Sequence, residues 1–291
     1  MPARARGGGG VAEALGSTEA VTRALAGESY LADRGLATSV YLAATLEQPL
    51  LLEGEAGVGK TEVARALAAA TGAELIRLQC HEGIDLHHAV YDWDYGRQLL
   101  AIRAAEAGSE ARELFGREFL LRRPLLQALE HEGPSVLLID EIDRADDEFE
   151  AFLLEFLSDF AISIPELGTV QAKQRPLVVL TSNRTRELHD ALKRRCLYHW
   201  IDYPDPEREA EIVRARLPGV PEAIALRVCD AVARLRAEEL YKLPGVGETI
   251  TWARALLALG PDEPLEDTLG VALKVREDIE RVRETGVLRG A

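Results

Sequence analysis

One run of eight residues has the composition of a loop that binds phosphate groups. It consists of Gly54, Glu55, Ala56, Gly57, Val58, Gly59, Lys60 and Thr61. The spacing G-x-x-x-x-G-K-[ST] lets glycines turn backbone N–H groups towards nucleotide phosphates. Lys60 would place its charge at the β and γ phosphates, and the Thr61 hydroxyl would bind Mg²⁺. An incidental glycine-rich turn is the alternative, but an apolar run precedes the loop and a helical run follows, as the motif requires.

Two carboxylates directly follow a second apolar run. Residues 136–139 have the composition of a buried strand, and Asp140 and Glu141 come next. Ligands of open parallel sheets bind beyond the carboxyl ends of the strands. We therefore expect Asp140 to hold Mg²⁺ through its water shell, and Glu141 to orient or deprotonate an attacking water. Two solvated acids at a strand end are the alternative, which the complete phosphate loop upstream disfavours.

An uncharged amide occupies a similar place after a third apolar run. Residues 177–180 are followed by Thr181, Ser182 and Asn183. The Asn183 amide would contact the γ phosphate or position the water, whereas an isolated Asn at a strand end is more often a turn or cap residue. Because it follows the other two elements in order, we interpret it as part of the same site. The three elements together predict an enzyme that hydrolyses ATP with Mg²⁺.

These residues need a sheet whose strands end at one edge. A helical pattern at 31–46 stops before Pro49, residues 50–52 have the pattern of a buried strand, and the loop then leads into a helix at 61–70. Strands that alternate with helical segments predict a parallel α/β sheet sandwiched by helices, the fold of P-loop NTPases.

Other segments exceed what a minimal α/β domain requires. Residues 95–114 have helical composition, and residues 160–172 have the pattern of a hairpin with strands at 161–164 and 169–171. Both insertions would project from one face of the domain. From residue 207 to 284 the strand pattern is gone, and amphipathic helices alternate with Pro-Gly or Gly-Pro pairs.

The chain therefore divides into three predicted parts. Residues 1–16 include four consecutive glycines and are expected to form a flexible leader. Residues 17–204 would form the α/β nucleotide-binding domain, and residues 205–291 a smaller, all-helical lid domain.

The charge balance bears on the class of partner. The chain has 34 Lys and Arg residues against 49 Asp and Glu residues, a formal net charge of −15. Affinity for nucleic acids comes largely from basic side chains that neutralise phosphates. The nearest candidate for such a basic stripe is a run of three, Lys193, Arg194 and Arg195. We therefore expect no nucleic-acid partner.

Cysteine spacing and apolar run length bear on location. Cys80, Cys196 and Cys229 are far apart and lack C-x-x-C spacing, which disfavours a disulfide framework and a zinc ribbon. No run approaches the roughly 18 to 20 apolar residues of a membrane span, and the first ten residues lack the apolar region of a signal peptide. We expect a cytoplasmic protein without membrane insertion.

In this order the motifs resemble those of the AAA+ ATPases. The resemblance extends from about residue 30 to the C-terminal helices and rests on the phosphate loop, VLLIDEID at 136–143, LTSN at 180–183 and ALKRRC at 191–196. Within AAA+ the chain is similar to the MoxR branch, most of all to its CoxD-type subgroup, in QCHEGID at 79–85, YDW at 91–93, RQLL at 97–100 and YHWIDYP at 198–204. This resemblance implies a chaperone-like ATPase that helps to activate a partner enzyme or to insert its cofactor.

The resemblance implies further site residues. Arg195, with Arg194 as the rival, matches the arginine finger that reaches the γ phosphate of ATP in a neighbouring subunit. A basic helix end that interacts with its own dipole is the alternative. A shared site implies a ring-shaped homo-oligomer, a hexamer. Arg254 falls near the position of the family's second sensor in the helical lid, although the sequence around it differs from the family's usual Pro-Arg pair. The hairpin at 161–171 matches a region that many AAA+ proteins direct towards a central pore.

Partners are implied in the same way. The client would be a protein, a metalloenzyme of the molybdenum/copper type by analogy with the CoxD-type subgroup, and the adaptor would carry a von Willebrand A-type domain. Two other functions stay open. A nucleic-acid-remodelling motor is disfavoured by the negative charge, and a nucleotide-switched scaffold with little turnover is disfavoured by Glu141 and Arg195.

Overall fold

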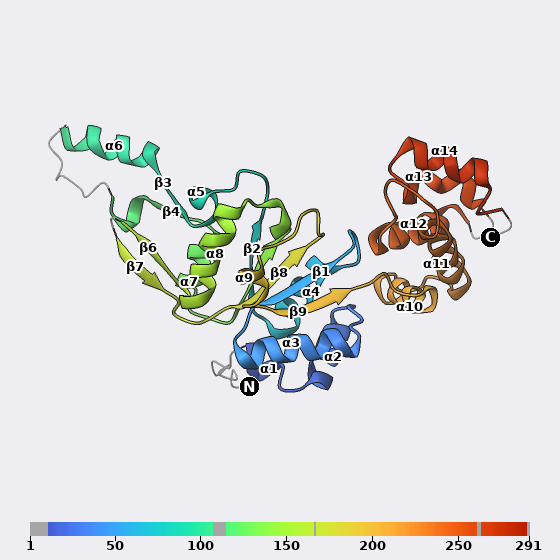
Figure 1. Ribbon diagram of the computed structural model, residues 1–291, viewed down its shortest axis with the longest axis horizontal. Helices are drawn as coiled ribbons and strands as arrows, with labels where there is room; N and C mark the ends of the chain where they lie inside the picture. Colours follow the sequence, from blue (N-terminus) through green and yellow to red (C-terminus); the bar gives the residue numbers. More distant parts are fainter. Residues whose placement is uncertain (1–10, 107–114, 166, 261–262, 290–291) are drawn as a thin grey trace, which may run out of the picture.

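The centre of the molecule is a five-stranded parallel sheet with the strand order β2-β5-β8-β1-β9 (Figure 1). The computed structural model describes residues 11–106, 115–165, 167–260 and 263–289. The strands of the sheet are β1 (Leu50–Gly54), β2 (Glu74–Gln79), β5 (Ser135–Asp140), β8 (Leu177–Ser182) and β9 (Leu197–Ile201). The three middle strands, β5, β8 and β1, are those that lead into the two acids, Asn183 and the phosphate loop.

The middle strands are apolar along most of their length because helices cover both faces of the sheet. Every residue of β1, β5 and β8 is buried. Side chains on one face share a core with α2 (Thr18–Gly27), α3 (Arg34–Leu46) and α4 (Lys60–Thr71). Those on the other face share a core with α5 (Leu86–Ala89), α7 (Pro124–Glu130), α8 (Asp147–Asp159) and α9 (Asp190–Lys193). Figure 1 shows α2 and α3 on one side of the sheet and α8 on the other.

Two apolar side chains tie residues 11–16 to the core. These residues contain the short helix α1 (Val11–Ala14), and Val11 and Leu15 are buried with the residues of α3. The prediction of a flexible leader over residues 1–16 is therefore wrong for its second part, because apolar side chains after the glycines find a place in the core. Residues 1–10 lie outside the described part of the chain.

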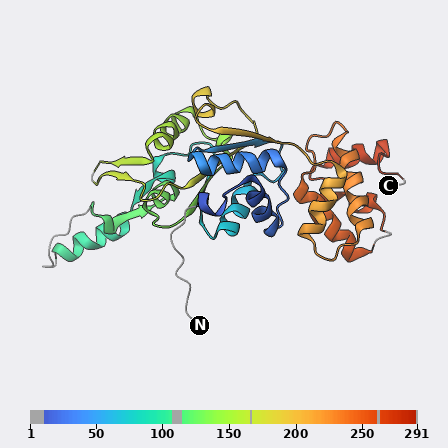
Figure 2. The ribbon, with the colours of Figure 1, turned by 90° about the horizontal axis from the view of Figure 1, so that it is seen from below.

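Both predicted insertions leave the domain at the same end (Figures 1 and 2). One consists of an antiparallel pair with a helix and a short 3₁₀ turn, namely β3 (Tyr91–Trp93), α6 (Tyr95–Glu106), η1 (Arg117–Phe119) and β4 (Leu120–Arg122). The other is the hairpin of β6 (Ala161–Ile164) and β7 (Gly168–Gln171), which confirms the predicted hairpin. The helical prediction for residues 107–114 falls outside the described residues.

The C-terminal region is helical and has a core of its own. Its elements are α10 (Pro206–Arg216), α11 (Glu222–Arg236), α12 (Val246–Leu259), η3 (Leu265–Thr268), α13 (Leu269–Ala272) and α14 (Arg276–Thr285). Their buried side chains form one cluster around Trp252. The predicted fold class is confirmed: a parallel α/β sheet with flanking helices, followed by a helical region that we call the lid. No helix in the described ranges is long and apolar enough to cross a membrane.

Candidate functional site

The phosphate loop connects β1 to α4 and forms a cradle for an anion. Gly57 and Gly59 have φ angles of +80° and +95°, which residues with a Cβ rarely adopt. Gly57 is also enclosed, since an added Cβ would lie 2.8 Å from the Cα of Gly245 in the lid. Helix α4 begins at Lys60, so its unpaired backbone N–H groups point out of the end where the loop lies.

Lys60 is buried inside this cradle. Its Nζ donates to the carbonyl oxygens of Gly54 at 2.8 Å and Glu55 at 2.6 Å. Burial lowers the pKa of Lys60, and nearby carboxylates, with Asp143 first among them, act in the opposite direction. The ammonium group is thus held by neutral carbonyl oxygens, and its charge is available to phosphate oxygens.

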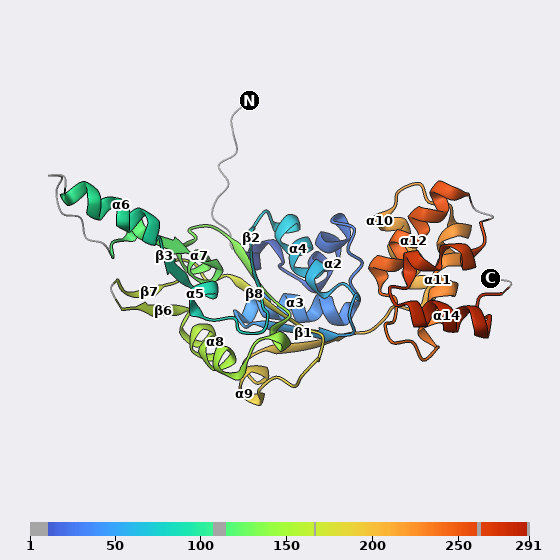
Figure 3. The same ribbon diagram turned by 90° about the horizontal axis from the view of Figure 1, so that it is seen from above.

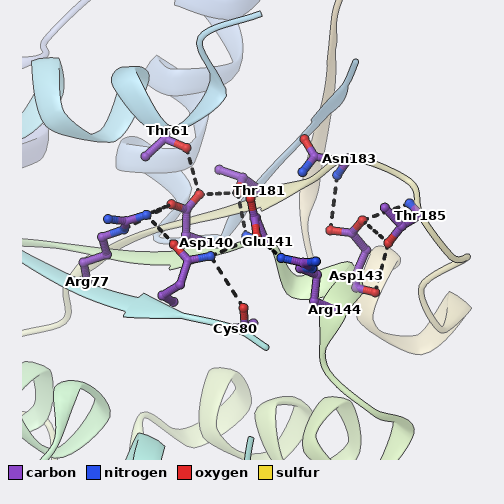
Figure 4. A network of polar contacts seen from close by, with 11 residues as sticks. Thr61, Arg77, Cys80, Asp140, Glu141, Asp143, Arg144, Thr181, Asn183 and Thr185 are labelled. Atoms are coloured by element: carbon purple, nitrogen blue, oxygen red, sulfur yellow. Dashed lines mark hydrogen bonds and ion pairs between the residues drawn. The ribbon is translucent and has the colours of Figure 1, made fainter. Parts of the chain in front are cut away.

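The carboxylate of Asp140 is the centre of a polar network beside the loop (Figure 4). Its Oδ1 accepts hydrogen bonds from Thr61 Oγ1 at 2.9 Å and from Thr181 Oγ1 at 2.6 Å. Its Oδ2 accepts from Arg77 Nε at 3.1 Å and Nη2 at 2.6 Å. A hydroxyl and a carboxylate this close, beside a phosphate cradle, are oxygen ligands of the kind that Mg²⁺ prefers. Thr61 and Asp140 therefore fit the metal.

Glu141 turns sharply out of the strand. Its φ and ψ angles are +55° and +50°, in the left-handed region. Its N–H donates to Thr181 Oγ1 at 2.9 Å. Its Oε2 accepts from Gln79 Nε2 at 3.1 Å and lies 3.4 Å from Arg144 Nη1. The side chain is 34% exposed, so a water can reach this carboxylate.

Asn183 is held through its backbone by a buried acid. Its N–H donates to Asp143 Oδ1 at 3.2 Å, and Thr185 donates to Asp143 Oδ2 from its N–H at 2.9 Å and its hydroxyl at 2.7 Å. Asp143 follows Glu141 by two residues, so the segments after β5 and after β8 are tied together. This anchoring keeps Asn183 at the same cavity as Asp140 and Glu141.

A cavity of about 660 Å³ lies between the carboxyl edge of the sheet and the lid. Such a volume is in the range of sites for cofactor-sized ligands. The α/β domain contributes residues 29–31, Asp33, Leu36, residues 56–62, Asp140, Glu141, Thr181 and Asn183. The lid and the segment that leads to it contribute residues 200–205, Arg208, Ile212, Arg216, Val246, Gly247, Glu248 and Ile250.

The lid also contacts the phosphate loop directly. The N–H of Val246, at the start of α12, donates to the carbonyl of Gly57 at 2.9 Å. The hydroxyl of Tyr203 donates to the carbonyl of Ala56 at 3.2 Å. Two adjacent carbonyl groups of the loop are therefore held by the lid and by the segment before it. The N–H group of each of these two peptide units points in the direction opposite to its carbonyl.

Comparison with known families decides the general chemistry. A family model described as AAA domain, dynein-related subfamily, matches residues 49–196, just over half of the chain. The chain belongs to this family. AAA domains are ATPase domains, and they generally bind ATP with Mg²⁺. Domain III of the replication initiation protein DnaA from Thermotoga maritima is a similar solved structure, with 15% sequence identity and a TM-score of 0.47, over 88% of this chain and 95% of that one.

The AAA domain brings together most of the residues predicted from the sequence. The phosphate loop, Asp140, Glu141 and Asn183 meet at one cavity. Arg194 and Arg195 do not: both are exposed on the turn after α9, away from the cavity lining. Within the described part of the chain neither side chain has a hydrogen-bond or ion-pair partner.

Arg254, the candidate lid sensor, is not among the residues that line the nucleotide cavity. Arg254 lies in the middle of α12 and is exposed. The residues of α12 that line the cavity are Val246, Gly247, Glu248 and Ile250, from its first two turns. The helix begins at Val246 and meets the loop with that end, so Arg254 lies further along the helix, and its role as the lid sensor stays a prediction.

Three polar side chains of this AAA site have no role in the sequence analysis. Arg77 and Gln79 extend from β2 towards Asp140 and Glu141, and Thr181 joins these two acids from β8. Arg77 and Gln79 are exposed positions that alternate with buried Leu78 in a short strand. Polar side chains spaced by two on one face of an otherwise apolar strand are the signal that could have found them.

Proposed function

We propose that this AAA protein is a MoxR-type ATPase that uses ATP hydrolysis to remodel a partner protein or to insert its cofactor. The observation that carries the proposal is the meeting of Lys60, Asp140 and Glu141 at one cavity that the lid closes against the phosphate loop. The sequence similarity to the CoxD-type subgroup supports a metalloenzyme, of the molybdenum/copper type, as the client.

The site supports hydrolysis through its own residues. Lys60 and the loop N–H groups hold the phosphates, and Thr61 and Asp140 hold Mg²⁺, which when bound neutralises phosphate charge. The Glu141 carboxylate, one-third exposed and bordered by Gln79, would orient the attacking water and accept its proton. Asn183 would contact the γ phosphate from the neighbouring strand end.

Arg195, or its rival Arg194, would complete the site of a neighbouring subunit. Both arginines are exposed and lack partners among the described residues, as a finger that acts on another copy requires. Arginine fingers contribute a factor of about 10³ to 10⁵ to turnover. The active form would then be a ring, a hexamer by family resemblance.

The two insertions are the surface that we assign to the client. They project from the end of the molecule opposite the lid (Figure 3). Helix α6 exposes apolar side chains there, with Leu100 at 66% and Leu99 at 52% exposure. Exposed apolar side chains gathered on a projection are typical of protein contact. An adaptor with a von Willebrand A-type domain would link the ring to this client.

Capture of the ATP-bound state tests the proposal. Glu141→Gln, loaded with ATP and Mg²⁺, should retain a protein client during purification from its own cell extract, and Lys60→Ala, which lacks the phosphate-binding charge, should not. Mass spectrometry identifies what is retained, and a metalloenzyme is the expected result. Turnover that rises several-fold with DNA and is unaffected by any retained protein would contradict the proposal in favour of a nucleic-acid motor.

A further inference from the structure

Arg77 donates hydrogen bonds to one carboxylate oxygen of Asp140, the acid that is expected to bind the metal. It stands on β2, two residues before Gln79, which lies opposite Asp140 in the strand register. From there its Nε and Nη2 reach Asp140 Oδ2 at 3.1 and 2.6 Å. The other oxygen, Oδ1, is taken by the hydroxyls of Thr61 and Thr181. Both oxygens of the carboxylate are therefore engaged by protein donors (Figure 4).

The surroundings of Asp140 favour a counter-charge. The side chain of Asp140 is 3% exposed, and a buried carboxylate is costly without a cation or several hydrogen bonds. The charge of Lys60 acts on Asp140 from nearby, but its Nζ donates its hydrogen bonds to two loop carbonyls and not to this carboxylate. Among the described residues, Arg77 forms the ion pair with Asp140.

The side chain of Arg77 can also move away from Asp140. Its side chain is 40% exposed on an edge strand, so moving it into solvent costs far less than moving a buried arginine. Its Nη2 has a second acceptor in Gln79 Oε1, on the same strand. The guanidinium can therefore keep one partner while it releases Asp140.

We propose that Arg77 is an internal counter-ion of Asp140 that gives way to Mg²⁺ when the nucleotide binds, and that it sets how much Mg²⁺ strengthens ATP binding. The inference rests on the proposed ATP and Mg²⁺ site. A metal ion beside the same carboxylate repels the guanidinium, so the hydrogen bonds of Arg77 to Asp140 weaken as the metal arrives. A residue that merely held Asp140 in place would have the opposite effect, because its loss would weaken metal binding.

Dissociation constants of a fluorescent, non-hydrolysable ATP analogue, measured in EDTA and in saturating Mg²⁺, test the inference. Arg77→Met keeps the length of the side chain and removes its charge. The constant in EDTA should stay within about twofold, and the constant in Mg²⁺ should become roughly tenfold tighter, since a hydrogen bond to a charged group is worth at least about one decade. Arg77→Lys, which keeps the charge without the two-donor geometry, should give a smaller gain in the same direction.

Arg65→Met is the matched control. Arg65 is an exposed arginine of α4 that pairs with Glu62, and its loss should change neither constant. An unchanged or weaker constant in Mg²⁺ for Arg77→Met overturns the inference, and so does a loss confined to EDTA, which would make Arg77 a phosphate ligand. If Arg77→Met binds the analogue in neither condition, the sign of the change in Arg77→Lys decides. A wild-type protein that does not bind the analogue in either condition would contradict the proposed function itself.

Discussion

At the scale of single residues, one hydroxyl orients both acids of the site. Glu141 adopts a left-handed conformation that costs a residue other than glycine about 1 to 2 kcal/mol. Thr181 stabilises it, because its Oγ1 accepts the N–H of Glu141 at 2.9 Å and donates to Asp140 Oδ1 at 2.6 Å. The geometry of the two acids at the end of β5 is therefore set from the neighbouring strand β8.

Thr181→Val should remove the hydrogen bonds of the hydroxyl to Glu141 and Asp140 while it keeps the side-chain volume. The N–H of Glu141 would lose its acceptor, a loss of about 1 to 3 kcal/mol. We expect turnover of ATP to fall by about tenfold to a hundredfold, with nucleotide affinity changed by less than about threefold. Steady-state kinetics and nucleotide titration measure the two effects. Thr181→Ser keeps the hydroxyl and should retain turnover; equal losses in both variants would show that the hydroxyl is not the cause.

Glu141→Gln tests the chemistry of the carboxylate itself. The substitution keeps the shape of the side chain and removes its ability to accept a proton, so turnover should fall by about 10² or more. ATP binding should be retained, because Lys60 and the loop are untouched. Glu148→Gln, at an exposed acid on α8, is the control and should be as active as the wild type. Unchanged turnover in Glu141→Gln would refute the assignment of Glu141.

At the scale of elements, the start of α12 is fitted against the phosphate loop by two glycines. A Cβ on Gly245 would lie 2.7 Å from the Cα of Gly57 and 2.9 Å from its carbonyl oxygen. The next residue, Val246, donates its N–H to that same oxygen at 2.9 Å. Close backbone contact between loop and lid therefore depends on the absence of a side chain at Gly245.

Gly245→Ala should push the lid away from the loop. Because the clash is with backbone atoms, we expect the affinity for ATP to fall by about tenfold, which corresponds to about 1.4 kcal/mol. Gly270→Ala is the matched control, since Gly270 is an exposed glycine of α13 and a Cβ added to it would meet no described atom within 4 Å. Nucleotide titration of both variants measures the effect. Similar affinities in the two would mean that the lid contact does not serve binding.

His199 makes the packing of β9 on α3 sensitive to pH. Its ring lies against Gly35, and its Nε2 is buried without a partner among the described residues. Burial lowers the pKa of His199 below its ordinary value of 6.5, and the charge of Asp33 offsets part of the shift. Below pH 6.5 the unfolded chain therefore binds more protons at this position than the folded chain, and stability falls as the pH decreases towards the folded pKa.

Replacement of this histidine should flatten the pH dependence of stability. The wild type should lose more in Tm than His199→Phe when the pH decreases from about 7.5 to about 5.5, because phenylalanine has no proton to bind. Thermal unfolding at several pH values measures the two slopes. Identical slopes would show that His199 is not the group that titrates.

The strands that were not predicted from the sequence are the two edge strands of the sheet. β1, β5 and β8 are apolar on both faces and were recognised from their runs. β2 alternates between exposed and buried positions, and β9 is only partly buried, so neither has such a run. Arg77 and Asp140 are 63 residues apart, and no local spacing indicates that strand order brings them together. The sequence thus predicted the motifs of the site but not the side chains that adjacent strands add to it.

At the scale of the whole molecule, the two candidate finger arginines lie apart from the rest of the site. Lys60, Asp140, Glu141 and Asn183 meet in one cavity, while Arg194 and Arg195 are exposed elsewhere without partners among the described residues. A finger worth a factor of about 10³ to 10⁵ corresponds to roughly 4 to 7 kcal/mol of transition-state stabilisation. If Arg195 supplies it to a neighbour, turnover is a property of the assembled ring.

Mixed rings provide the decisive measurement. Lys60→Ala subunits keep an intact Arg195, and Arg195→Ala subunits keep an intact phosphate loop, so each type is inactive alone but can complete the other. In a random ring with equal amounts of both, about a quarter of the interfaces combine the two intact halves, and turnover should recover to about that fraction.

Lys60→Ala mixed with Glu141→Gln is the control. Lys60 and Glu141 belong to the same half of the site, the half that binds the nucleotide. Every interface in this mixed ring therefore has a damaged nucleotide-binding half, and no turnover should return. Arg194 would be the finger if Arg195→Ala is active by itself and if the mixture of Lys60→Ala with Arg194→Ala recovers turnover. Strictly zero recovery in verified mixed rings would show that the site is not shared.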